Sequence, residues 1–364
     1  MDETVHWHLS GRDGTGKDFV MGIYPMLLDE TCFFLAADFD KSSWQEDAVA
    51  FLKTCHQLNL TAALERSRSG KGGHVWLFFD ETIPATLARK LGCHILTETM
   101  DHHPGIGMDS YDRFFPNQDT LPQGGFGNLI ALPLQKKARN NGNSLFVDEN
   151  LIAYEDQWAF LAALRKVTRH EAETIVHSAE TKGRIVGAHI RVSEEDDLTP
   201  WNRQVAHSKT ISSDLPKSLG VVISNEIYIP KNGLSPWLKN RLTRLAAFPN
   251  PEFFKAQAMR LPTYEKPRMI TCAEDYPQHI GLPRGCLDDL LLLFSDLKIK
   301  LTIQDELQSG IPLKSNFLGE LRSDQKAAAS AMLKTDFGVL SATTAFGKTV
   351  IGAWLISKRK ANTK

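Results

Sequence analysis

The chain has 364 residues, of which 42% are hydrophobic, and its formal net charge at pH 7 is −1. The length exceeds one ordinary domain, and this hydrophobic content is ample for packed cores. The near-zero charge excludes a general electrostatic attraction to nucleic acid, so any such binding must depend on local basic groups.

The cysteine and hydropathy patterns narrow the class further. Five cysteines, an odd number, occur without a Cys-x-x-Cys pair, which argues against a zinc ribbon and favours a reducing compartment. No apolar run approaches the roughly 20 residues of a membrane span. The acidic, polar N-terminus lacks the pattern of a signal peptide. We therefore expect a cytoplasmic protein without a membrane partner.

Two aspartates follow the first strongly apolar segment. Residues 32–39 predict a buried strand, and Asp38 and Asp40 stand at its exit. Because strand side chains alternate, both aspartates point the same way, with Cβ atoms roughly 6 to 7 Å apart. Paired carboxylates of this kind suit Mg²⁺ or Mn²⁺, not Zn²⁺.

The alternative role for these aspartates is a turn or a helix cap, where Asp is common. The next helix, predicted at 43–58, already has a capping box in Ser43 and Glu46. We therefore expect Asp38 and Asp40 to serve another purpose.

A glycine-rich basic loop joins the next two predicted strands. Its glycines allow backbone N–H groups to approach an anion closely, and Arg68, Ser69 and Lys71 add donors and positive charge. His74 begins the strand that follows the loop. The alternative is a hairpin with a solvated basic tip, but the carboxylate pair one helix earlier favours polyphosphate binding.

A third carboxylate is expected after the helix predicted at 84–100. Asp119 is favoured, because it follows a short apolar strand and a Gly-Gly turn joins it to the next strand. Asp112 is the alternative third ligand, although it also suits a structural pairing with Arg113.

These elements alternate between strands and helices in an order that fits an α+β sandwich around a split βαβ unit. The predicted elements are strands at 32–39, 60–66, 74–80, 113–118 and 128–134, with helices at 43–58 and 84–100.

The Asp-x-Asp pair, the Ser-Gly-x-Gly-x-His phrase and a later Asp resemble the archaeo-eukaryotic primase superfamily. More narrowly, residues 34–40, 65–76 and 115–119 look like the primase-polymerase of TOTE conflict systems, which is fused to a superfamily 2 helicase. The resemblance covers about residues 1–160. It implies an RRM-like (ferredoxin-like) catalytic core.

The resemblance also implies roles for the residues singled out. Asp38, Asp40 and Asp119 would carry two Mg²⁺ or Mn²⁺ ions, and His74, Ser69 and Lys71 would hold an incoming NTP or dNTP. The implied reaction is in-line attack of a primer 3′-hydroxyl on the α-phosphate. The implied partners are a DNA template and primer, nucleotides, and the helicase portion or other conflict-system proteins.

A second phosphate-binding motif lies near the C-terminal end. Residues 338–341 predict a strand, and the loop that follows enters a helix at Gly347, Lys348 and Thr349, which is the context of a P-loop. Lys348 would contact phosphates and Thr349 a Mg²⁺ ion. Gln325 resembles the adenine-reading glutamine of superfamily 2 helicases.

The chain reaches only Lys364, so the acidic strand and second lobe of a RecA-like ATPase are not encoded in it. We therefore expect no helicase or ATPase activity and interpret the chain as a truncated primase-helicase. The alternative function is a catalytically silent nucleic-acid-binding or regulatory module.

The predicted organisation has four parts. The third, a mixed α/β accessory region, resembles the region ahead of the ATPase core in the fused helicases. The four parts are a primase-polymerase domain at 1–160, a helical and acidic linker at 161–210, the accessory region at 211–315, and the first strand, P-loop and helix of a RecA-like lobe at 316–364.

Overall fold

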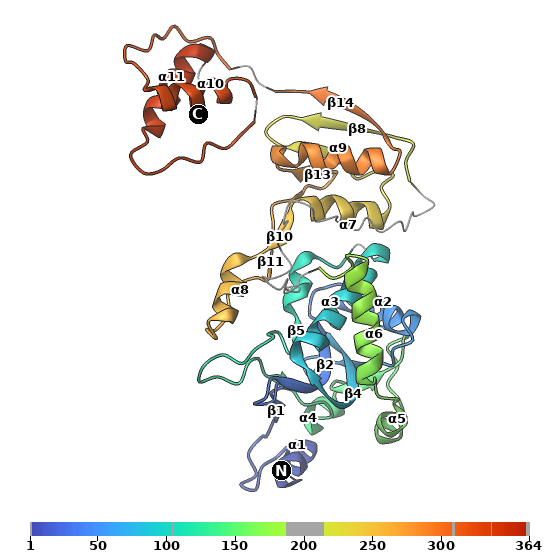
Figure 1. Cartoon of the computed structure of the whole chain (residues 1–364). Helices are drawn as coiled ribbons and strands as arrows, with labels where there is room; N and C mark the ends of the chain where they lie inside the picture. The colour runs from blue at the N-terminus through green and yellow to red at the C-terminus, as the bar shows by residue number, and fades with distance from the viewer. Residues whose placement is uncertain (1, 104, 187–214, 308–309, 336, 362–364) are drawn as a thin grey trace. The chain divides into compact units, whose positions relative to one another are not determined.

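A computed structural model describes residues 2–103, 105–186, 215–307, 310–335 and 337–361 (Figure 1). The chain divides into two compact units. The first contains the described residues up to 186, together with Ser235–Arg241 and Ala247–Thr271. The second contains the described residues of 215–234, Leu242–Ala246 and those from Cys272 onward.

The first unit is built on a five-stranded antiparallel sheet in the order β5-β2-β4-β3-β7. Two smaller antiparallel pairs, β1 with β6 and β10 with β11, complete its strands. The strands are β1 (Gly22–Ile23), β2 (Thr31–Phe39), β3 (Ala63–Arg66), β4 (Gly73–Pro84), β5 (Phe114–Phe115), β6 (Ile130–Ala131), β7 (Leu145–Val147), β10 (Ala247–Pro249) and β11 (Met269–Thr271). The helices are α1 (Asp2–Ser10), α2 (Trp44–Gln57), α3 (Ala85–His102), η1 (Met108–Asp112), α4 (Lys136–Asn140), α5 (Gln157–Ala163), α6 (Arg169–Thr181) and α8 (Pro251–Ala258).

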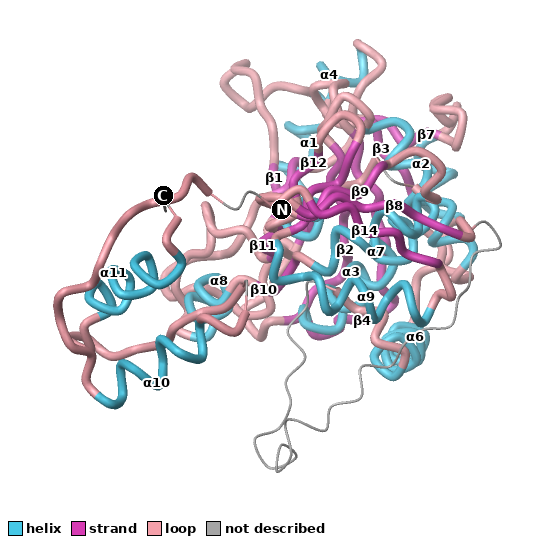
Figure 2. The backbone as a smooth tube through the Cα atoms, turned by 90° about the horizontal axis from the view of Figure 1, so that it is seen from above, coloured by secondary structure: helices cyan, strands magenta, loops and turns pink. Residues whose placement is uncertain are grey.

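The two faces of this sheet carry different clusters, and alternation along β2 decides which residues reach each face. Leu35 and Ala37 join the larger core with residues of α2, α3 and α6, which are labelled in Figure 2, where all helices are cyan. Ala36 joins a smaller apolar cluster with Trp76 on the other face. Asp38 has the parity of Ala36, so it lies on the face opposite these helices.

The predicted long elements correspond to β2, α2, β3, β4 and α3. The strands expected at 113–118 and 128–134 are much shorter, because β5 and β6 each pair over only two residues. β5 ends at Phe115 because Pro116, which follows, has no N–H group to donate to a ladder.

The capping box predicted at Ser43 and Glu46 is not formed. Ser43 is the N-cap of α2, but its side chain makes no capping hydrogen bond. Its hydroxyl instead donates to Asp47 Oδ2 at 2.8 Å, because the Asp47 carboxylate, one turn along, competes for it.

The first unit extends beyond the boundary expected at residue 160. Ala172, Val176 and Ala179 of α6 are buried in the main core, because they form the apolar stripe of that helix. Residues 247–271, predicted to belong to an accessory region, also pack in the first unit. The expected linker residues 187–210 lie outside the described residues.

Gly92 marks the tightest approach of α3 to the sheet. An added Cβ would lie 2.9 Å from side-chain atoms of Leu35 and of Phe114. Alanine gains about 1 kcal/mol in helix propensity, but overpacking typically costs about 1–3 kcal/mol. We therefore expect Gly92→Ala to lower the free energy of unfolding of the first unit in urea titration.

A matched control for this substitution is Gly352→Ala in α11 (Lys348–Arg359), where nothing lies within 4 Å of the added Cβ. We expect that variant to be neutral or stabilising for the second unit. A gain in stability for Gly92→Ala would contradict the close packing of α3.

The second unit contains a sheet in the order β12-β13-β9-β8-β14, in which only the β8–β14 pair is parallel. α7 (Pro236–Leu245) spans the division between the units. The other elements are β8 (Ser218–Ile223), β9 (Ile227–Pro230), β12 (Glu274–Asp275), β13 (His279–Leu282), η3 (Arg284–Cys286), α9 (Leu287–Asp296), β14 (Lys300–Asp305), α10 (Ser323–Met332) and α11. None of the helices described here has the length and apolarity that a membrane span requires.

The strand predicted at 338–341 is not formed. These residues have no strand assignment, and Val339 is 88% exposed. A strand depends on ladder hydrogen bonds to a neighbour, and the described chain pairs no strand with this segment. The helix predicted after it is present as α11.

Candidate active site

Asp38 and Asp40 lie at the C-terminal end of β2. The side chain of Asp38 is 24% exposed and that of Asp40 is 50% exposed. Burial raises the pKa of Asp38, and the negative charge of Asp40 raises it further, although His74 and Arg113 oppose this. Bringing a cation to this end of the strand would relieve the repulsion between the two carboxylates.

His74 stands beside Asp38 on the neighbouring strand. The two residues are partners in the β2–β4 ladder, and His74 Nε2 lies 3.6 Å from Asp38 Oδ1. On its other side, His74 Nδ1 lies 2.9 Å from Glu65 Oε2. Burial by itself would lower the pKa of His74, but the hydrogen bond and charge of Glu65, with the charge of Asp38, raise it.

Arg113, the residue before β5, supplies a positive charge to the same site. Its carbonyl accepts a hydrogen bond from the Asp38 backbone N–H at 2.9 Å, which fixes its position beside the strand. Its guanidinium forms an ion pair with Asp40. Burial acts to lower the pKa of Arg113, but its hydrogen bond and charge pairing with Asp40 raise it.

The glycine-rich loop closes the β3–β4 hairpin next to these residues. Ser67 N–H donates to the Gly72 carbonyl at 2.9 Å, and Gly70 N–H donates back to the Ser67 carbonyl at 2.9 Å. Gly70 has a φ of +74°, and a Cβ at Gly72 would lie 2.7 Å from the Phe39 carbonyl oxygen. The hairpin therefore packs directly on the end of β2.

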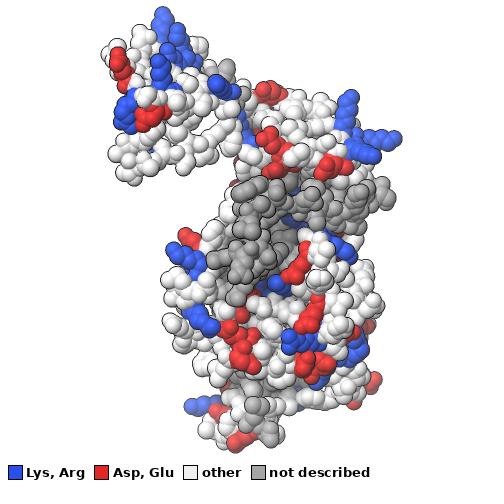
Figure 3. Space-filling model, in the orientation of Figure 1, with Lys and Arg blue, Asp and Glu red and all other residues white. Residues whose placement is uncertain are grey.

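The polar side chains of this loop are available to a ligand. Arg68 and Lys71 are exposed, and the Ser69 hydroxyl accepts a hydrogen bond from the Lys71 N–H at 3.2 Å. On the face drawn in Figure 3, acidic and basic side chains of the first unit are interspersed. This distribution agrees with the near-zero net charge, so anion binding here depends on a few local cations.

The structure does not bring Asp119 to this cluster. Asp119 lines a pocket of about 470 Å³ with Thr31 and Pro84, which pair at the opposite end of β2. Asp38 lies seven residue steps along β2 from Thr31, or about 23 Å along the sheet. The chain reaches that end because it continues beyond the short β5 in the direction away from Asp38.

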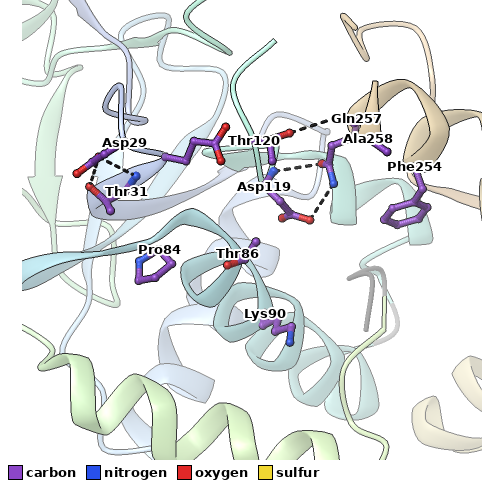
Figure 4. Close-up of a pocket in the computed structure, with 11 residues that line it drawn as sticks. Asp29, Thr31, Pro84, Thr86, Lys90, Asp119, Thr120, Phe254, Gln257 and Ala258 are labelled. Carbon is purple, nitrogen blue, oxygen red and sulfur yellow. Dashed lines mark hydrogen bonds between the residues drawn. The ribbon is translucent and has the colours of Figure 1, made fainter. Parts of the chain in front are cut away.

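Asp119 instead takes part in a partly buried polar network, of which Figure 4 shows the contacts with Gln257. Its Oδ1 lies 3.1 Å from Nε of the fully buried Arg89. Gln257 of α8 donates to Asp119 Oδ2 at 2.9 Å and accepts from the Asp119 N–H at 3.1 Å. This placement indicates that Asp119 attaches residues 251–258 to the sheet.

Asp112, the alternative third ligand, is engaged by another residue. It is the last residue of η1, and its Oδ1 accepts a hydrogen bond from the Arg268 N–H at 2.7 Å. Within the described part of the chain, no group of three or more His, Cys, Asp or Glu side chains forms a potential metal site.

The P-loop residues lie in the second unit. Gly347, with a φ of +89°, is the N-cap of α11, and Lys348 begins the helix. Lys348 Nζ donates to the carbonyls of Ala342 and Thr343, both at 3.1 Å. Gln325 Nε2 donates to the Phe346 carbonyl at 2.7 Å, so it contacts the same loop.

The site roles of two residues were not predicted from the sequence. These are Glu65, the partner of His74, and Arg113, the cation beside Asp40. Glu65 is a charged residue within an apolar strand, and its pairing with His74 through the β3–β4 hairpin was a usable signal. Arg113 gave no such local signal, because its position depends on the pairing of β5 with β2.

The first unit is a mixed α/β unit with an antiparallel sheet. Paired carboxylates, a histidine and a glycine-rich basic loop lie together at one end of its central strands β2 and β4. This arrangement is consistent with a primase domain. Residues 1–175 match the family model described as "TOTE conflict system, Archaeo-Eukaryotic Primase domain". This match confirms the primase part of the resemblance and suggests nucleotidyltransferase activity in general. No curated protein was found to match the chain.

Proposed function

We propose that this protein is a template-dependent DNA primase-polymerase that transfers nucleotides by a two-metal mechanism. The observation that carries the proposal is the strand register that pairs Asp38 with His74 beside the glycine-rich loop. Both residues lie within the segment that matches a primase family model. DNA template, primer and nucleotides would be its partners, with the other proteins of a conflict system.

An RRM-like core is part of the same proposal. β2, α2, β3, β4, α3 and β5 follow one another along the chain, and their strands lie in the order β5-β2-β4-β3. A β-α-β-β-α-β sequence of elements is that of a ferredoxin-like fold. This order supports the RRM-like interpretation of the first unit.

The residues present fit a divalent cation. Asp38 and Asp40 offer only oxygen ligands, and Mg²⁺ is commonly held by one or two carboxylates together with substrate phosphates. When bound, Mg²⁺ or Mn²⁺ would supply the positive charge that stabilises the attacking and leaving oxygens of the displacement. The third ligand expected at Asp119 or Asp112 has no support in the geometry.

The chain's own residues would bind and orient the nucleotide. Lys71, Arg68 and the Ser69 hydroxyl would hold the β- and γ-phosphates, and His74 would donate from Nε2 toward them. The primer 3′-hydroxyl would lose its proton to water as its oxygen bonds to the α-phosphorus, while the α–β phosphoanhydride bond breaks and releases pyrophosphate. Arg113 would keep Asp40 oriented through their ion pair.

Extension of a labelled primer on a DNA template tests the proposal. We expect template-dependent products with Mn²⁺ or Mg²⁺, using dNTPs or NTPs, and none in excess EDTA. Nucleotide and DNA binding without synthesis would instead favour a catalytically silent binding or regulatory module.

Lys71 provides a quantitative test of the phosphate-binding loop. Because its exposed ammonium would contact only the polyphosphate, we expect Lys71→Ala to raise KM for the nucleotide about tenfold, equivalent to about 1.4 kcal/mol. The measurement is steady-state primer extension over a range of nucleotide concentrations. Lys348→Ala, which changes the lysine at the start of α11 in the second unit, is the control and should leave KM for primer extension unchanged.

For residues 316–364 we propose the phosphate-binding part of a RecA-like lobe. Gly347 and Lys348 would contact phosphates, Thr349 would bind a Mg²⁺ ion, and Gln325 would contact the adenine. Lys348 bonds to carbonyls of its own loop, so a phosphate would have to displace these contacts. Our proposal for these residues does not include helicase activity.

A further inference from the structure

Glu65 is a buried carboxylate directly behind the site histidine. Its side chain is only 2% exposed, and it is the ladder partner of His74 in the β3–β4 hairpin. It shares a face with Ala63 and Trp76, both in the smaller apolar cluster. Burial of a carboxylate in such surroundings is unfavourable unless the charge is matched by donors.

Most of the hydrogen-bonding partners of the Glu65 carboxylate contact one of its two oxygens. Oε2 lies 2.9 Å from His74 Nδ1 and accepts from Trp76 Nε1 at 3.0 Å. Oε1 accepts from the Ser144 hydroxyl at 3.5 Å. Glu65 is therefore held from two sides, and its own position is fixed by the strand ladder.

These contacts leave one orientation for the His74 ring. With Nδ1 bonded to Glu65, Nε2 faces Asp38 at 3.6 Å. Trp76 packs edge-on against the ring, with a centroid distance of 6.1 Å and an interplanar angle of 81°. A half-turn of the ring would exchange Nδ1 for a carbon atom and lose the bond to Glu65.

We propose that Glu65 is a positioning residue, which holds His74 so that Nε2 faces the polyphosphate of the incoming nucleotide. This inference rests on the proposed function for the role of His74 in synthesis. The orientation of the ring by Glu65 is testable without any synthesis.

Glu65→Leu removes the acceptor and replaces the carboxylate by an apolar side chain of similar volume. Loss of the group that orients a metal-ligating histidine typically costs about 10- to 100-fold in activity, and we expect kcat/KM for primer extension to fall by a similar factor here. Glu65→Gln keeps an acceptor oxygen for Nδ1 and Trp76 Nε1, so we expect it to remain within about threefold of the original protein. Thermal unfolding of both variants establishes that each is folded.

A double substitution separates positioning from a general structural role. If Glu65 acts through His74, then Glu65→Leu should lower kcat/KM no further in a His74→Ala background, because the two effects share one pathway. An equal loss in both backgrounds would overturn the proposal.

Long-range ¹H–¹⁵N spectra of the histidine rings give a readout that does not need activity. We expect a protonated, hydrogen-bonded Nδ1 for His74, assigned with His74→Ala, and loss of that signal in folded Glu65→Leu. An unchanged His74 signal in Glu65→Leu would overturn the proposal even if the protein synthesises DNA. The expected change in a protein without synthesis would support the orientation and contradict only the proposed function.

Discussion

Replacement of both Asp38 and Asp40 by asparagine is expected to abolish primer extension, with a fall in kcat/KM of at least about a thousandfold. Asparagine keeps the size of each side chain but removes both negative charges that would hold a divalent cation. The repulsion that raises the pKa of Asp38 would disappear together with the partly exposed Asp40–Arg113 ion pair, so we expect little net change in stability. Single-turnover extension of a labelled primer measures the effect.

Asp29→Asn is the matched control for this pair. Asp29 lies beside the other end of β2, where its Oδ1 accepts from the Thr31 N–H and hydroxyl, and asparagine retains an acceptor there. We expect synthesis by this variant to be unchanged. Continued synthesis by the Asp38→Asn/Asp40→Asn variant would show that these carboxylates are not the metal ligands.

Replacement of Asp119 by alanine is expected to lower the free energy of unfolding of the first unit by about 3–5 kcal/mol, because it leaves a buried guanidinium unpaired. The guanidinium is that of Arg89, whose side chain is 0% exposed. The substitution also removes the acceptor that Gln257 uses. Urea unfolding followed by tryptophan fluorescence measures the loss.

Asp109→Ala is the control, because its ion pair with Lys41 is exposed on both sides and surface pairs contribute only about 0–1 kcal/mol. Activity per folded molecule then tests the role of Asp119. We expect it to be retained in Asp119→Ala at temperatures well below unfolding. A folded Asp119→Ala protein as inactive as the Asp38→Asn/Asp40→Asn variant would instead favour the third-ligand prediction and contradict the structural role.

The sequence was informative where a local pattern decides the structure. Alternation along the apolar segment 32–39 predicted a buried strand with Asp38 at its exit, and β2 forms there with Asp38 in register with His74. The strands predicted on the two sides of the glycine-rich loop are present, and they pair as the β3–β4 hairpin. Both features depend on only a few consecutive residues.

Local pattern was insufficient where several groups competed for one partner. Ser43 and Glu46 have the spacing of a capping box, but Asp47 takes the Ser43 hydroxyl. Residues 338–341 have the composition of a strand, but within the described chain no neighbour pairs with them. In each case the local preference was small, and the available partner determined the outcome.

The sequence by itself determined the paired aspartates, the glycine-rich loop and the histidine that follows it, because each lies within one strand or one hairpin. Only the tertiary structure decided which distant residues join them. Strand pairing brought Glu65 behind His74 and Arg113 beside Asp40, whereas the direction of the chain after β5 carried Asp119 to the far end of β2. Such neighbours are set by hydrogen bonds between separate strands. A local pattern cannot predict them, because register is a property of two paired strands and not of either strand alone.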